Sequence, residues 1–173
     1  MTALSKKVGR VIDFEGSFRT GIQQASIIDF KNFQVINTKE YIGSDGRFSD
    51  WLLENTHHCQ IDYWVAHNVP VEKNMVNKHT PYRNNLNRNE STTNWGPWLD
   101  TLKVYKSLYP SINNYALNNL RENFIDAYKI EVLANKYCKR TQKKIHHSMF
   151  DSIITFLLLE RLQNKINLSL FLV

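Results

Sequence analysis

Asp13 and Glu15 form an Asp-x-Glu pair at the end of a predicted strand over residues 8–14. Side chains two residues apart on a strand point to the same face, so both carboxylates can reach one point in space. Like charges after a buried apolar strand are costly unless a cation neutralises them, and carboxylate oxygens suit Mg²⁺ or Mn²⁺. Taken alone, however, the pair is better explained as a solvated strand end with two unrelated charges.

A second cluster lies near the carboxyl end, where His146 precedes Asp151 by five residues and an apolar helix follows at once. A histidine on the loop before a helix can accept a proton from a metal-bound water while a carboxylate holds the metal. His147 competes for this role by adjacency. The simpler alternative makes Asp151 a first-turn residue that the helix dipole favours, and the histidines polar loop residues.

A third segment, AHNVPVE, runs from a predicted strand end into a helix and ends on Glu72. From that helix Glu72 would present a further carboxylate. In isolation, an ordinary solvated glutamate explains it better.

Hydrophobic patterning predicts the elements that must position these side chains. Strands are expected over residues 8–14, 23–29, 33–41, 61–66 and 98–101, with a turn at 29–32. Helices are expected around residues 51–53 and over 71–77, 101–108, 125–137 and 147–162, with a polar loop over 78–94. Three strands followed by alternating strands and helices predict an α/β fold, a mixed sheet flanked by helices. A length of 173 residues predicts one domain spanning 1–173.

The amino-acid composition indicates a folded protein and bears on its partner and location. The chain is 42% hydrophobic and 22% charged, as folded proteins are, and its net charge of +6 favours a polyanionic partner. With neither a signal peptide nor a membrane span expected, the predicted location is cytoplasmic, without membrane association. Two cysteines are too few for a disulfide framework. A zinc site that joins His57, His58 and Cys59 to Cys138 and the 146–147 histidines lacks the usual ligand spacing.

Taken together and in order, four segments resemble the DnaQ-like (DEDDh) 3′–5′ exonucleases. They are VIDFEGS, AHNVPVE, GPWLDTLKVYKSLYP with YALNNL, and HHSMFDSIIT, and the similarity covers residues 8–162. The resemblance implies a ribonuclease H-like fold with a mixed five-stranded sheet. It also implies metal-dependent release of nucleoside monophosphates from the 3′ end of DNA, or of RNA.

The resemblance assigns roles to particular residues. Asp13, Glu15 and Asp151 would gather one Mg²⁺ or Mn²⁺ ion, and Asp13 with Glu72 the second. His146 would be the general base, since the family spacing selects it over His147. The expected contacts with the nucleic acid, a single-stranded 3′ end of DNA, are Gly16, Ser17, Phe18, Asn68, Lys143 and Lys144. A polymerase or a nucleic-acid-processing complex is a further candidate partner.

Two departures from the family pattern keep alternatives open. The second motif usually ends in Asp, whereas this chain has Glu72, which reaches one methylene further. Asp100, in WLDTL, could assist the second metal, although its family role is closer to structure. A turn that contacts the terminal nucleotide in many relatives is missing. The alternatives are a relative that binds nucleic acid with weakened catalysis, and an accessory subunit of a polymerase or processing complex.

Overall fold

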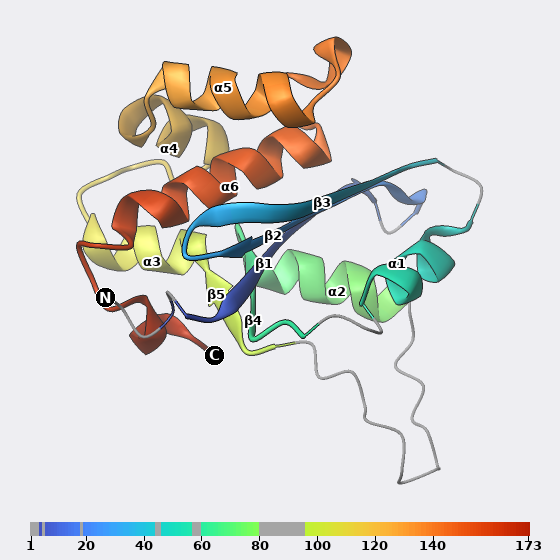
Figure 1. Ribbon diagram of the computed structural model, residues 1–173, viewed down its shortest axis with the longest axis horizontal. Helices are drawn as coiled ribbons and strands as arrows, with labels where there is room; N and C mark the ends of the chain where they lie inside the picture. The colour runs from blue at the N-terminus through green and yellow to red at the C-terminus, as the bar shows by residue number, and fades with distance from the viewer. Residues whose placement is uncertain (1–3, 5, 18, 44–45, 57–59, 80–95) are drawn as a thin grey trace, which may run out of the picture.

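The centre of the molecule is a five-stranded mixed sheet in the order β3-β2-β1-β4-β5 (Figure 1). The computed structural model describes the chain except for residues 1–3, 5, 18, 44–45, 57–59 and 80–95. The strands are β1 (Val8–Ser17), β2 (Gly21–Lys31), β3 (Gln34–Ile42), β4 (Tyr63–Ala66) and β5 (Trp98–Asp100). The first three form an antiparallel meander, and β4 and β5 extend it in parallel from β1. The predicted α/β fold class is therefore confirmed.

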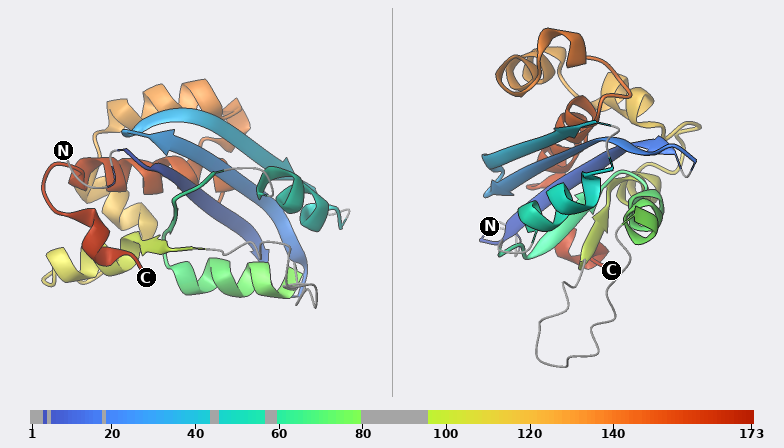
Figure 2. Two further views of the ribbon diagram at one scale, coloured as in Figure 1. Left: turned by 60° about the horizontal axis from the view of Figure 1, so that its bottom comes forward. Right: turned by 90° about the vertical axis from the view of Figure 1, so that its right-hand side faces the viewer.

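Helices cover both faces of this sheet. On one face lie α3 (Thr101–Leu108), α4 (Leu117–Phe124), α5 (Ala127–Tyr137) and the long α6 (Ser148–Leu162). On the other face lie α1 (Phe48–Thr56) and α2 (Val69–His79), as Figure 2 shows from two further sides. Two short 3-10 helices, η1 (Arg140–Gln142) and η2 (Leu168–Phe171), precede and follow α6. Because both faces are covered, β1 and β2 bury apolar residues of both parities, whereas the edge strand β3 is largely polar.

Strand β1 illustrates this double burial. Val11 packs into the cluster beneath α6, and its neighbour Ile12 packs into the cluster on the α1 and α2 side. Helix α6 is buried along almost its whole length, which explains its run of apolar residues. Within the described residues, no helix is both long and apolar enough to cross a membrane.

The predicted turn over residues 29–32 is wrong in its position. Strand β2 continues to Lys31, and the turn falls on Asn32 and Phe33, whose φ angles are 51° and 56°. Asp29 belongs to the strand because its carboxylate is buried and accepts two hydrogen bonds from Arg10, at 2.6 and 2.9 Å. An aspartate that looks like a turn residue in the sequence is thus half of a buried ion pair.

Strand β5 is covered by the end of the chain. The backbone of Val173 exchanges hydrogen bonds of 2.8 and 2.9 Å with that of Trp98, and Leu168 is fully buried. The carboxyl-terminal backbone therefore pairs with β5 and Leu168 packs into the core, whereas the side chains of Leu170 and Val173 are exposed.

Candidate metal centre

Asp13 and Glu15 lie inside β1, at the centre of the sheet, rather than beyond its end. The amino-terminal end of α6 brings a third carboxylate to them. One ligand atom each from Glu15, Asp151 and His146 lies within 4.8 Å of the other two. The structure thus brings the first and last sequence motifs together.

Asp13 is surrounded by acidic groups. Burial raises the pKa of its carboxyl well above the usual value, and the charges of Asp151, Glu72 and Glu15 raise it further. Among the described residues, its Oδ2 atom is buried and has no hydrogen-bond partner. An ionised carboxylate in this position requires a cation to balance it.

Glu72 enters from the other side of the sheet, in the first turn of α2. Its side chain is buried, and burial raises the pKa of its carboxyl to about 8. No described residue supplies a hydrogen bond to its Oε2 atom. The extra methylene of this glutamate does not displace the group from the site, because its charge still acts on Asp13.

Asp151 lies in the first turn of α6 and is buried. Its Oδ2 atom accepts a hydrogen bond of 3.0 Å from the backbone N–H of His146, whereas Oδ1 has no partner in the described part of the chain. Burial raises the pKa of its carboxyl to about 7; the bond from His146 opposes this shift and the Glu15 charge adds to it.

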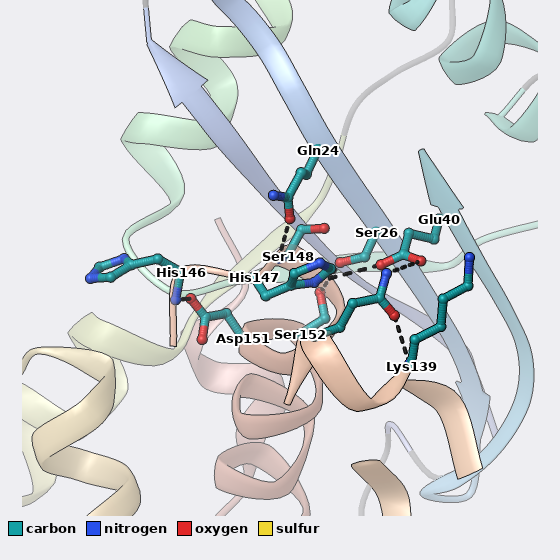
Figure 3. A network of polar contacts seen from close by, with 10 residues as sticks. Gln24, Ser26, Glu40, Lys139, His146, His147, Ser148, Asp151 and Ser152 are labelled. Carbon is teal, nitrogen blue, oxygen red and sulfur yellow. Dashed lines mark hydrogen bonds and ion pairs between the residues drawn. The ribbon is translucent and has the colours of Figure 1, made fainter. Parts of the chain in front are cut away.

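The two adjacent histidines point in opposite directions (Figure 3). The His146 side chain is 84% exposed, with Nδ1 3.9 Å from Glu15 Oε1. The His147 ring is buried and faces Glu40, with 3.7 Å between Nδ1 and Oε1. The geometry therefore places His146, and not His147, beside the carboxylates.

These observations fit a divalent cation. Asp13, Glu72 and Asp151 each hold a buried carboxyl oxygen that no other described group satisfies, and their pKa values are raised. Buried oxygens of this kind are the ligands that Mg²⁺ and Mn²⁺ prefer.

No protein-family model matches the sequence, and a search of curated proteins also finds no match. Solved structures do match. Exonuclease X in complex with 5′ overhanging duplex DNA gives a TM-score of 0.57 at 17% identity, over 91% of this chain and 92% of that one. Exonuclease I gives 0.61 at 14% identity, over 91% of this chain and 41% of that one. A zinc-bound E. coli exonuclease I complex with single-stranded DNA gives 0.55 at 14% identity, over 92% and 41%.

The chain has the fold of these exonucleases. It spans almost the full length of exonuclease X, and about two fifths of the exonuclease I chains. The resemblance to the DnaQ-like exonucleases is thus confirmed at the level of the fold.

Asp100 stabilises the backbone at the start of α3 and before α2. It caps α3 by accepting hydrogen bonds from the backbone N–H groups of Leu102 and Lys103, and it also accepts one of 3.0 Å from Asn68. Asn68 has a φ of 72° at the start of α2. Asp100 therefore holds the turn that leads to Glu72, and its charge helps to raise the pKa of that carboxyl.

His67 supports the same region from the side of β4. Its Nε2 atom lies 2.9 Å from the Tyr115 carbonyl oxygen, and Nδ1 lies 2.9 Å from Thr101 Oγ1. Burial lowers the pKa of this imidazole. Both ring nitrogens are used, so the histidine of AHNVPVE fixes the loop before α4.

The residues expected to contact the substrate lie at the end of β1 and in the segment before α6. Gly16 and Ser17 lie at the β1–β2 connection, and Phe18 lies outside the described residues. A Cβ atom on Gly16, whose φ is 152°, would lie 2.2 Å from the Gly21 carbonyl oxygen, so the approach of the two strands already requires glycine here. Lys143 and Lys144 are exposed just before His146.

The sequence analysis did not predict one polar contact between segments far apart in the chain. Glu40 and Gln142 contact each other although 102 positions separate them, which no local pattern reveals. The zinc grouping that the sequence argued against includes residues 57–59, which lie outside the described part of the chain; its Cys138 is a buried free cysteine.

Proposed function

We propose that this protein is a metal-dependent 3′–5′ exonuclease that releases nucleoside monophosphates from DNA, with RNA as the alternative substrate. One observation carries the proposal. Asp13, Glu72 and Asp151 hold buried carboxyl oxygens that are unsatisfied within the described residues, and the charges of Glu72 and Asp151 act on Asp13. Asp151 and Glu15 lie beside an exposed imidazole, His146. The shared fold with exonucleases X and I supports the same class of reaction, and the DNA in two of those structures makes DNA the first substrate to test.

The carboxylates would hold two Mg²⁺ or Mn²⁺ ions. Asp13, Glu15 and Asp151 would bind one, and Asp13 with Glu72 the other. Two such ions stabilise the charge on the attacking and leaving oxygens in phosphodiester hydrolysis. Because Glu72 and Asp151 are buried, their interactions with charge are stronger than in bulk water.

His146 would accept the proton of the attacking water. Its ring is exposed and within 3.9 Å of Glu15, so it can reach a solvent molecule near the carboxylates. Ser17 and Asn68 would lie beside the terminal nucleotide, and Lys143 and Lys144 would contact phosphates further along the strand.

The test uses 5′-labelled single-stranded DNA, duplex DNA with a 5′ overhang, and RNA, resolved on a denaturing gel with Mg²⁺, Mn²⁺ or EDTA. We expect a ladder that shortens from the 3′ end with either metal and disappears in EDTA. Asp13→Asn should lower the rate about a thousandfold or more, and His146→Ala about a hundredfold or more. Asp50→Asn, at an exposed aspartate of α1, is the matched control and should cut at the normal rate.

Two other results would contradict the proposal. Shortening from the 5′ end would overturn the polarity. No cleavage of any substrate, with binding intact, would favour the relative with weakened catalysis. Glu72→Asp would then be the next variant, because it restores the residue that the family pattern has.

A further inference from the structure

Glu40 and His147 form a largely buried pair at the start of α6. Glu40 lies on the edge strand β3, and His147 is the residue that precedes α6. Their facing atoms, Oε1 and Nδ1, are 3.7 Å apart, and the side chains are only 19% and 9% exposed. Figure 3 shows the His147 ring turned toward Glu40 and away from His146 and Asp151.

The pair continues into η1. The Oε2 atom of Glu40 accepts a hydrogen bond of 3.1 Å from Gln142, and Gln142 in turn accepts one of 2.6 Å from the backbone N–H of Lys139. Gln142 is buried as well. One carboxylate on β3 therefore contacts both ends of the connection between η1 and α6, namely Gln142 and His147.

Contacts with β2 fix the first turns of α6. Gln24 Oε1 accepts a hydrogen bond of 3.4 Å from the backbone N–H of Ser148. The hydroxyl groups of Ser26 and Ser152 are 2.7 Å apart and buried. The helix start that carries Asp151 is thus held independently of Glu40.

His146 lies between η1, which contacts Glu40, and the start of α6, which contacts β2. Its backbone conformation is unfavourable unless neighbouring contacts hold it. Its φ angle of 62° is in the left-handed region, which costs conformational energy for a residue with a side chain. The hydrogen bond from its backbone N–H to Asp151 provides one restraint. The neighbouring His147, turned toward Glu40, provides the other.

We propose that Glu40 and Gln142 are positioning residues for His146: by holding His147 and η1, they keep the connection in the one conformation that presents the His146 imidazole to Glu15. This inference rests on the proposed function for its kinetic consequence. Its structural content, that Glu40 controls the backbone at His146, stands apart from activity.

The kinetic test compares Glu40→Ala, Glu40→Gln and the control Glu54→Ala, at an exposed glutamate of α1. We expect Glu40→Ala to lower kcat about 10- to 100-fold with KM nearly unchanged, because the base is misplaced while the substrate still binds. Glu40→Gln keeps an acceptor for the hydrogen bond from Gln142 and a polar group facing His147, so it should recover most of the rate. Glu54→Ala should match the wild type.

A double-variant cycle with His146→Ala shows whether Glu40 acts through His146. In the His146→Ala background, Glu40→Ala should cause little further loss, since the group that it positions is gone. Full additivity of the two losses, or an unchanged kcat in Glu40→Ala, would overturn the proposal.

Amide hydrogen exchange measured by NMR decides the structural content even if the wild type has no nuclease activity. In Glu40→Ala the His146 N–H should exchange faster, while amides in the middle of α6 keep their protection. Unchanged exchange at His146 would overturn the proposal. Loss of protection throughout α6 would also overturn it, since Glu40 would then support the fold as a whole. An inactive wild type would refute only the proposed function.

Discussion

At the residue scale, Glu72 and Asp151 carry carboxyl groups whose pKa values, about 8 and about 7, lie far above the usual 4.5 and 3.8. Between the usual pKa values and the raised ones, that is between about pH 4 and about pH 8, the folded chain binds more protons than the unfolded chain. The free energy of unfolding therefore falls as pH rises through this window. A divalent cation bound to the ionised groups would reverse this loss.

We expect the melting temperature in EDTA to fall between about pH 5 and pH 8, and added Mn²⁺ to raise it more at pH 8 than at pH 5. Glu72→Gln should stabilise the metal-free protein at pH 8 by about 2 kcal/mol, or about 5 °C, because it removes a buried charge. Circular dichroism melting curves measure both effects. Asp50→Asn should follow the wild-type curve, and no gain from Glu72→Gln at pH 8 would contradict the assignment of a raised pKa.

At the element scale, β1, β2 and the end of α1 are joined by the buried Arg10. Its guanidinium binds Asp29 through two hydrogen bonds, donates one of 2.7 Å to the Asn55 carbonyl oxygen, and lies 5.2 Å from the centre of the Trp64 ring. Asn37 on β3 donates a further bond of 3.0 Å to Asp29. A buried charged pair thus joins β1, β2, β3 and α1.

Replacing one member of this pair should be costly. Arg10→Met leaves the Asp29 carboxylate buried without its cation and should lower the free energy of unfolding by about 3 kcal/mol or more. The exposed pair of Lys129 and Glu160 is the control, and Lys129→Met should cost less than about 1 kcal/mol. Urea denaturation distinguishes them. Equal losses for the two variants would show that burial of the Arg10 pair does not set its contribution.

At the scale of the whole molecule, the net charge of +6 is the feature that bears on a nucleic-acid partner. Four exposed basic residues lie in the chain between α5 and His146: Lys139, Arg140, Lys143 and Lys144. If they follow the phosphate backbone, binding releases counterions and depends on salt.

With the Asp13→Asn protein, which should bind without cutting, affinity for single-stranded DNA should fall about 30-fold or more between 50 and 200 mM KCl, as about four phosphate contacts require. Replacing Lys143 and Lys144 by Ala should reduce the slope of log K against log salt by about 1.4. Fluorescence anisotropy measures both quantities. An unchanged slope in that variant would place the strand elsewhere on the surface.

The sequence alone determined the features that depend on local periodicity and order. The two-residue spacing of Asp13 and Glu15 placed both on one face of a strand, and the order of strands and helices predicted a sheet flanked by helices. These are properties of a strand or helix whatever packs against it. The resemblance of the motifs to the DnaQ-like exonucleases implied that Glu72 and Asp151 would join Asp13 and Glu15.

The family resemblance selected His146 over His147, but only the tertiary structure shows why His146 faces the carboxylates, and that Asp29 is buried rather than in a turn. His146 and His147 have the same chemistry, and one backbone angle together with a glutamate on the edge strand separates them. Such choices depend on contacts between segments far apart in the chain, where the energy of a buried polar group is set by its partner and not by its neighbours in sequence.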